Sequence, residues 1–456
     1  MRPYLLLVSG LVTWVLAPGA LAQQTEPTDA ESADLRERLE AQENRLRELE
    51  NRQDEEQALE QRLEEQQQRI DQLESSRFDS SGSGGRGPEV DVSGFINAGF
   101  QSTNLGKTGP TYRNTDNELR ATNFTSAGVQ IDGRVTDKVS GTVQLLALGT
   151  DNFDTETEWA YLSYKMNPSL KFRAGRLVLP FYMNSQSYYV NYAHPWVSPP
   201  AEVYDTAPLR SVEGADVTWQ FNTGEIAHSL NYYFGSTQVD SGFVNTQLEQ
   251  IPYDVHNSTG INLSSTIGNM NTWLAYSSGD VSLNLSNAPT PPSVPAPTTY
   301  GAYTLDNDSA YFGSAGFEYD DGNLLVEAEY VELDIKSDWI PKSNAQYVTL
   351  GYRFGSWTPH VTWAASEDTT YDQAEEDPRP LTESLYNNTK THQKSWTLGV
   401  RNDVAPGLAL KAEVSTYYDI GASDDGGAND SGFFSGPIPA DEDDPMVFRL
   451  AANLVF

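Results

Sequence analysis

The sequence contains no cysteine and only five histidines among its 456 residues. Without cysteine the chain has neither disulfide bridges nor thiolate ligands, which suits an oxidising compartment. The histidines lie in separate segments, no pair has metal-ligand spacing, and no G-x-S-x-G occurs. The sequence therefore predicts no catalytic residues, no metal centre, no cofactor and no enzymatic activity.

Positive charge is also scarce. Lys and Arg together number 29 against 64 Asp and Glu, which gives a net charge of −35. A chain this acidic is not expected to bind nucleic acid. Much of the acid falls in residues 368–377 and 419–444, where carboxylates could hold Ca²⁺ weakly or bridge to lipopolysaccharide through divalent ions. Because their spacing matches no strong calcium motif, we expect mainly a solvated, repelling surface.

Long hydrophobic runs are absent after the N-terminus, where no stretch reaches the roughly 18 apolar residues that a spanning helix needs. Residues 1–22 combine Arg2, an apolar segment and the small-residue site Ala20-Leu21-Ala22, which is the pattern of a signal peptide. The sequence therefore predicts an exported protein. If it is a membrane protein, it must cross the membrane as a barrel.

Residues 31–77 have a helical composition, rich in Glu, Gln, Arg and Leu. Residues at alternating spacings of four and three form a coiled-coil seam: Leu35, Leu39, Gln42, Leu46, Leu49, and again Leu59, Leu63, Gln66, Ile70, Leu73. We expect three helices to associate here, with a solvated single helix as the alternative. Residues 78–88, which include SSGSGGRGP, read as a flexible linker.

From residue 89 onward the chain alternates apolar and polar residues in about sixteen segments. They begin near Val90, Phe124, Val139, Trp159, Leu170, Ala215, Ile226, Gly260, Met270, Ala310, Leu324, Gln346, Thr358, Ser395, Leu408 and Met446. Short polar turns alternate with longer loops between them, as in outer-membrane barrels. The predicted fold is an all-β transmembrane barrel of about sixteen antiparallel strands over residues 89–456, preceded by the coiled coil. A soluble β-sandwich is the alternative.

Aromatic residues are plentiful, with 24 Tyr and 9 Trp. We expect several near strand ends to form girdles at the two lipid interfaces. These are Trp159, Tyr161, Trp219, Tyr232, Tyr319, Tyr330 and Tyr352.

The third long loop, residues 178–212, differs from the others because it carries seven large aromatic residues and five prolines. A wholly exposed loop would rarely hold so many rings. We expect it to fold into the lumen, with a position across a subunit contact as the alternative. A barrel of about sixteen strands otherwise leaves an aqueous channel.

This third loop, after a strand ending Ala174-Gly175-Arg176, resembles the constriction loop of trimeric sixteen-stranded porins. With the N-terminal coiled coil, the chain is similar to the DcaP-like dicarboxylate-uptake porins and, more distantly, to phosphate-selective porins. No arginine ladder is visible as a run, which puts phosphate in doubt. The resemblance implies a pore constriction formed by loop and wall residues: Lys171, Arg173, Arg176, Tyr182, Tyr188, His194, Glu202, Asp205 and Arg210.

Strand alternation separately predicts which wall charges face inward. The bases are Arg134, Lys171, Arg173, Arg353, Arg401, Lys411 and Arg449. The acids are Asp132, Asp216, Glu327, Glu329 and Glu413. The wall is thus predicted to be mixed.

The last strand, from Met446 to Phe456, alternates apolar residues and ends on an aromatic residue. By resemblance Phe456 serves as the signal to the barrel assembly machinery. The expected function is that of a homotrimeric porin in the outer membrane of a Gram-negative bacterium, with the coiled coil in the periplasm. It would pass small hydrophilic solutes by diffusion, including anions such as dicarboxylates. The alternative is a trimeric adhesin or cell-wall tether with a β-barrel anchor.

Overall fold

The computed structural model describes residues 89–106, 110–113, 115–121, 124–207, 209–243, 249–284, 304–337, 340–369, 392–420, 433–434 and 444–456. The predicted signal peptide, coiled coil and linker lie outside these residues, as do most of the two acidic segments.

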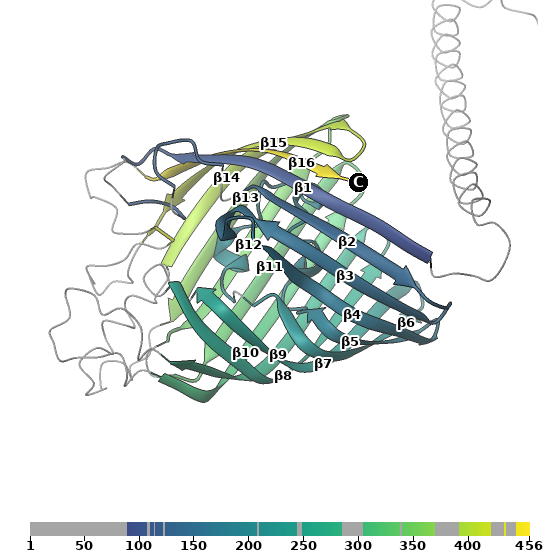
Figure 1. Ribbon diagram of the computed structural model, residues 1–456. Coiled ribbons are helices and arrows are strands. Elements are labelled where there is room, and N and C mark those ends of the chain that lie inside the picture. Colours follow the sequence, from purple (N-terminus) through teal and green to yellow (C-terminus); the bar gives the residue numbers. More distant parts are fainter. Residues whose placement is uncertain are drawn as a thin grey trace, which may run out of the picture. The chain divides into compact units, whose positions relative to one another are not determined.

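Sixteen β-strands in the described part of the chain close into one barrel. Each strand pairs antiparallel with its sequence neighbours, and β1 pairs with β16 to complete the ring (Figure 1). The strands are β1 (Glu89–Thr103), β2 (Ser126–Arg134), β3 (Val139–Leu148), β4 (Thr155–Asn167), β5 (Leu170–Val178), β6 (Ser211–Thr223), β7 (Ile226–Phe243), β8 (Glu249–Ile267), β9 (Met270–Asn284), β10 (Thr304–Asp320), β11 (Leu324–Ile335), β12 (Lys342–Tyr352), β13 (Trp357–Thr369), β14 (His392–Ala405), β15 (Leu408–Tyr418) and β16 (Met446–Val455).

The predicted barrel and its strand number are confirmed. The largest differences lie where strands leave long loops: β8 begins at Glu249 instead of near Gly260, and β10 at Thr304 instead of near Ala310. The additional residues include many polar ones, as in the run TLDNDS that opens β10. Because no apolar alternation marks this run of β10, the sequence pattern could not extend that strand so far.

The helices of the described chain are short: η2 (Gly149–Asp151), η3 (Ser185–Ser187), η4 (Asn191–Ala193) and α2 (Ala201–Tyr204). None of the helices in this part of the chain is long and apolar enough to cross a membrane. Three of them, η3, η4 and α2, belong to the third loop, which runs between β5 and β6. The main cluster of buried apolar side chains joins this loop to the strands around it.

The aromatic girdle prediction agrees with the structure for four of its seven residues. Trp219, Tyr232, Tyr330 and Tyr352 are exposed on the outer face, but Tyr161 lines a cavity in the lumen. Trp159 lies opposite the buried Gln144. The pairing from Trp159 to Tyr164 is regular, so strand alternation places both rings on the inner face with Lys165. The girdle prediction missed this because it used only their nearness to strand ends.

Candidate channel lumen

The barrel wall has an apolar outer face and a polar inner face. On β16, Phe448 and Leu450 are 43% and 53% exposed, whereas Arg449 between them is 7% exposed. This alternation follows from strand geometry, which sends successive side chains to opposite faces. The outer face therefore has the apolar character that a lipid environment favours.

The charges predicted to face inward lie on the lumen side. Asp132, Arg134, Lys171 and Arg173 line one cavity, and Glu327, Arg353 and Arg401 line another. Asp216 pairs with Arg173, and Arg449 donates to Gln101, Ser415 and Tyr417 in the interior. The remaining three bind the third loop: Glu329, Lys411 and Glu413.

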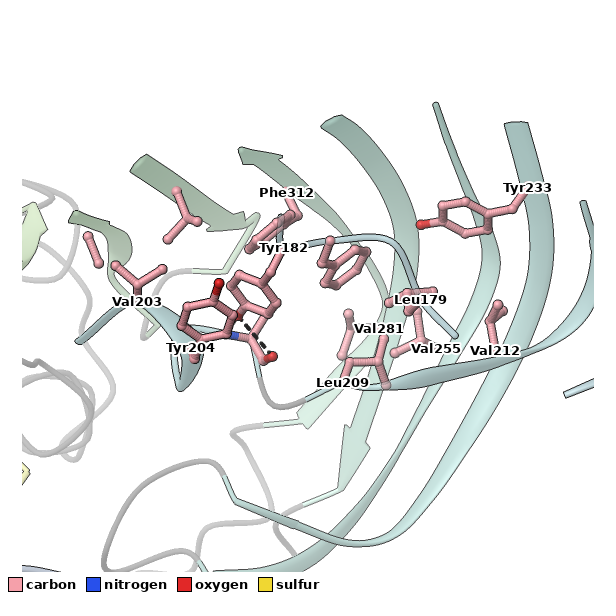
Figure 2. Close-up of a cluster of buried hydrophobic side chains, with 14 of the residues drawn as sticks. Leu179, Tyr182, Val203, Tyr204, Leu209, Val212, Tyr233, Val255, Val281 and Phe312 are labelled. Carbon is pink, nitrogen blue, oxygen red and sulfur yellow. Dashed lines mark hydrogen bonds between the residues drawn. The ribbon is translucent and has the colours of Figure 1, made fainter. Parts of the chain in front are cut away.

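The third loop lies inside the barrel, as predicted, and packs through its aromatic rings. Phe181 stacks on Phe312 of β10 with ring centroids 4.4 Å apart. Tyr182 and Tyr204 lie beside each other next to Phe312 in Figure 2, with their ring centroids 4.9 Å apart. Trp196 meets Tyr347 of β12 edge to face at 5.6 Å. These contacts explain why the loop carries so many large side chains.

Buried polar contacts fix the same loop to the opposite wall. Glu329 accepts hydrogen bonds from the Met183 backbone N–H at 2.6 Å and from the Tyr204 hydroxyl at 2.8 Å. Lys411 donates to the carbonyls of Asn191 and Trp196, each at 2.5 Å. Such charged hydrogen bonds in a buried setting are among the stronger ones. The loop is therefore held in place by charges of the barrel wall.

The loop also reaches the first strand and the first long loop. Asn97 of β1 donates to the Tyr189 carbonyl at 2.8 Å. Arg113, in the loop after β1, forms an ion pair with Asp205. Nearby, Tyr112 and Phe434 join a second buried cluster with Leu105, Tyr417 and Val447. The third loop therefore contacts the wall on several sides of the lumen.

The six predicted constriction residues of the third loop are mostly engaged in packing. Tyr182 is buried, and its hydroxyl accepts from the Ala207 N–H at 2.8 Å, while burial raises its pKa. Glu202 is buried and accepts from Gln393 at 2.9 Å. Asp205 pairs with Arg113.

Arg210, Tyr188 and His194 complete this set. The Arg210 guanidinium lies 3.6 Å from the Tyr188 ring centroid and donates to the Tyr204 carbonyl at 2.9 Å. His194 is buried against Trp196, with ring centroids 5.0 Å apart. Burial and then the nearby Lys411 charge lower the pKa of His194 to about 3. These side chains shape the loop's fold.

The predicted wall residues of the constriction divide between the two faces of β5. Lys171 and Arg173 face the lumen, and Arg173 donates to both oxygens of Asp216 at 3.1 Å. Arg176 lies three residues after Arg173, and the pairing of β5 with β6 has no register shift between them. Arg176 forms an ion pair with Glu213 of β6. Strand alternation therefore places it on the other face. The structure does not gather all of the predicted site residues at one point.

Two cavities lie on the lumen side near the short turns. The first has a volume of about 400 Å³ and is lined by Lys138, Lys165 and Lys171 with Arg134 and Arg173; its acids are Glu89, Asp91, Asp132 and Asp137. The second, of about 220 Å³, is lined by Glu318, Asp320, Glu327 and Asp403 with Arg353 and Arg401. The two cavities thus differ in charge balance.

Lys138, Lys165, Glu318, Asp320 and Asp403 were not among the residues singled out from the sequence. Lys165 and Lys171 flank the turn at Pro168 and Ser169, and the hairpin register pairs them directly. From this pairing the sequence analysis could have inferred that Lys165 faces the lumen together with Lys171. Charge alone did not distinguish it from a solvated turn lysine.

Among the described residues there is no group of three or more His, Cys, Asp or Glu side chains that could hold a metal ion. His228 lies on the outer face, where it stacks on Phe221 with centroids 4.8 Å apart, and His360 is buried inside. The outward direction of His228 and the inward direction of His360 both agree with strand alternation. The Ca²⁺ prediction concerns acidic segments that lie mostly outside the described residues.

Comparison with known proteins gives a likeness of fold. The outer membrane channel DcaP of Acinetobacter baumannii aligns with 12% identity and a TM-score of 0.50, over 82% of this chain and 100% of that chain. OmpF of Salmonella typhi, solved in complex with daunomycin, aligns with 13% identity and a TM-score of 0.50, over 81% of this chain and 98% of that chain. No protein-family model and no curated protein sequence matches the chain.

The closed ring of sixteen strands and these likenesses define the class of the fold, which is that of the outer-membrane porin barrels. The predicted resemblance to DcaP-like porins is confirmed at the level of fold.

Proposed function

We propose that this protein is an outer-membrane porin through which small hydrophilic solutes diffuse passively. The observation that carries the proposal is the third loop, which lies inside a closed barrel and is fixed there by Glu329, Lys411 and Glu413. A loop held rigidly in a lumen sets the width of the passage and its lining.

Such a porin would sit in the outer membrane as a homotrimer, in contact with lipid and lipopolysaccharide and inserted by the barrel assembly machinery. Its solutes would include small anions such as dicarboxylates. The support is electrostatic: bases outnumber acids in the larger cavity near the short turns. Fixed charges act strongly in a narrow, low-dielectric passage, so a local excess can outweigh the acidic charge of the whole chain.

The experiment is a planar bilayer recording of the purified protein in a KCl gradient. We expect discrete conductance steps and a reversal potential on the anion side. Absence of conductance steps from heat-modifiable, folded protein would remove the porin proposal. A cation-side reversal potential would remove the anion preference alone.

The Glu329→Ala variant tests whether the third loop sets the conductance. The substitution leaves the Met183 N–H and the Tyr204 hydroxyl without their acceptor, at a cost of about 1–3 kcal/mol for each buried group. We expect a higher and noisier single-channel conductance. The matched control is Glu332→Ala on the same strand, because Glu332 pairs with Lys342 and its side chain is 42% exposed. Equal conductance in the wild type and both variants would contradict the proposal that the loop sets the conductance.

A further inference from the structure

The side chain of Met183, at the start of the third loop, fills a gap in the barrel wall. Gly316 of β10 is paired with Trp273 of β9 on one side and with Glu329 of β11 on the other. A Cβ atom at Gly316 would lie 2.9 Å from the Met183 Sδ. The sulfur therefore occupies the space that a side chain at position 316 would fill, between Trp273 and Glu329.

Hydrogen bonds on both sides hold the backbone around Met183 against the same part of the wall. The Met183 N–H donates to the Glu329 carboxylate at 2.6 Å. The Ser314 hydroxyl donates to the Phe181 carbonyl at 2.6 Å, and it accepts from the Trp273 indole N–H at 3.0 Å. The loop is thus seated on β9, β10 and β11, and the Met183 thioether packs within this seat.

The distribution of methionines sets Met183 apart. The sequence has five, of which Met1 belongs to the predicted signal peptide. Met166, Met270 and Met446 lie on the outer face, where they are 49%, 40% and 37% exposed. Of the methionines in the described part of the chain, only Met183 lies in the lumen, where it is half-buried. A water-soluble oxidant inside the barrel therefore meets a single thioether.

A thioether reacts with a hydroperoxide by a two-electron oxygen transfer. The sulfur lone pair attacks one peroxide oxygen, an S–O bond forms and the O–O bond breaks. The other peroxide oxygen keeps the electron pair of that bond, takes up the remaining proton and leaves as water when the oxidant is hydrogen peroxide. The thioether is oxidised to a sulfoxide and the peroxide is reduced, so no further reactant is needed.

A sulfoxide fits the seat of the loop less well than a thioether does. Oxidation converts a flexible apolar side chain into a polar one that carries an additional oxygen. That oxygen bears partial negative charge, and the neighbouring Glu329 carboxylate, which is 2% exposed, repels it. Because Glu329 also holds the Met183 N–H, the oxidised side chain weakens the contact that fixes the loop to the wall.

We propose that Met183 is a site of reversible oxidation in the lumen. Small hydroperoxides convert it to methionine sulfoxide, and the sulfoxide releases the start of the third loop from the wall. The inference rests on the proposed porin function, since the channel admits the hydrophilic oxidant and the loop sets the conductance.

The test treats the purified full-length protein with hydrogen peroxide and uses three readouts: peptide masses, cleavage of the third loop by proteinase K, and single-channel conductance. We expect the Met183 peptide to gain the mass of one oxygen atom. Cleavage within residues 178–212 should become several-fold faster, and the conductance should become higher and noisier, as expected for Glu329→Ala.

Reversal shows that the sulfoxide causes these effects. Methionine sulfoxide reductases specific for each of the two sulfoxide epimers, supplied with a thiol reductant, should restore the original mass, cleavage rate and conductance. The reductant alone should change nothing, because the chain has no cysteine.

Two reciprocal variants serve as controls, each compared with itself before and after peroxide. Met183→Leu keeps the three methionines of the outer face, and Leu has a volume similar to that of Met. It should lose the response of both cleavage and conductance. The triple variant Met166→Leu, Met270→Leu, Met446→Leu keeps only Met183 in the described chain and should respond fully.

Several results would overturn the inference. They are a Met183 that stays unoxidised under conditions that oxidise free methionine, an oxidised Met183 with unchanged cleavage and conductance, and an undiminished response in Met183→Leu. Folded protein without channels would overturn the porin function instead. The peptide masses and the cleavage rate need no conducting channel, so they would still decide whether Met183 is an oxidation site that holds the loop.

Discussion

His194 illustrates how single side chains of the third loop are set by their surroundings. It is 4% exposed, its Nε2 lies 3.1 Å from the Ser187 carbonyl, and its own carbonyl accepts from Arg401 at 2.9 Å. Burial, followed by the Lys411 charge, lowers the pKa of the imidazole to about 3. The ring is therefore neutral at physiological pH, and its Nε2–H can donate to Ser187.

Because the folded pKa of His194 lies below its ordinary value of 6.5, the unfolded loop binds a proton first as the pH falls. The stability that His194 contributes is complete above about pH 6.5 and is lost as the pH falls toward 3. We expect the wild-type channel to become noisier between pH 7 and pH 4. In His194→Gln this increase should be smaller, since glutamine does not titrate.

Single-channel current noise at the two pH values is the measurement, and the difference between them removes any constant effect of the substitution. The control is His228→Gln, because His228 stacks on Phe221 at the outer face. An undiminished increase in the His194→Gln channel would assign the acid response to other groups.

At the scale of elements, the closing strand decides whether the barrel has an open edge. β16 pairs with β15 and β1, and Phe456 extends this pairing through two hydrogen bonds with Gly94, of 2.9 and 3.0 Å. A Cβ atom at Gly94 would lie 2.8 Å from the Gly128 carbonyl oxygen and 2.7 Å from the Phe456 ring, so a larger residue here would force the backbone of β2 to shift. The ring itself is 63% exposed and packs little.

For Phe456→Ala we expect a several-fold loss of folded barrel in cells, because the residue is predicted to act as an assembly signal. The purified variant should refold in detergent with a stability within about 0.5 kcal/mol of the wild type, as for an exposed residue. Heat modifiability on gels measures both. Phe448→Ala, another exposed aromatic position on β16, is the control. A normal amount of folded Phe456→Ala barrel in cells would contradict the assembly role.

At the scale of the whole molecule, the barrel follows a segment whose sequence favours helix association. That segment, residues 31–77, lies outside the described residues, so the coiled coil and the trimer remain predictions. A three-stranded coil would fix the number of barrels locally, and the Ser- and Gly-rich linker would separate the two parts mechanically.

We therefore expect an SDS-resistant, heat-modifiable trimer, measured by native mass and cross-linking. Replacing Leu39, Leu46, Leu63 and Ile70 by Ser should abolish helix association and leave channel activity unchanged. If the wild-type protein forms only monomers, the trimer prediction is wrong. Failure of barrel insertion in the Ser variant would show that the coil is needed for assembly.

Much of the barrel could be predicted because strand alternation is a local property of the sequence. Strand alternation alone correctly assigned residues as far apart as Asp132 and Arg449 to the lumen. The girdle prediction was wrong for Tyr161 because it used nearness to a strand end, whereas alternation along β4 places this ring on the inner face. The predicted constriction residues were less accurate as a set, because Arg173 and Arg176 belong to one strand but lie on its opposite faces.

The sequence by itself predicted about sixteen strands and the two faces of the wall, because alternation depends on side chains a few residues apart. Only the tertiary structure showed that the Glu329 carboxylate accepts hydrogen bonds from Met183 and Tyr204. Likewise, only the strand register showed that Lys165 and Lys171 lie opposite each other on neighbouring strands. These contacts depend on barrel closure, on hairpin register and on the path of the third loop. Such features join residues whose separation along the chain carries no periodic signal.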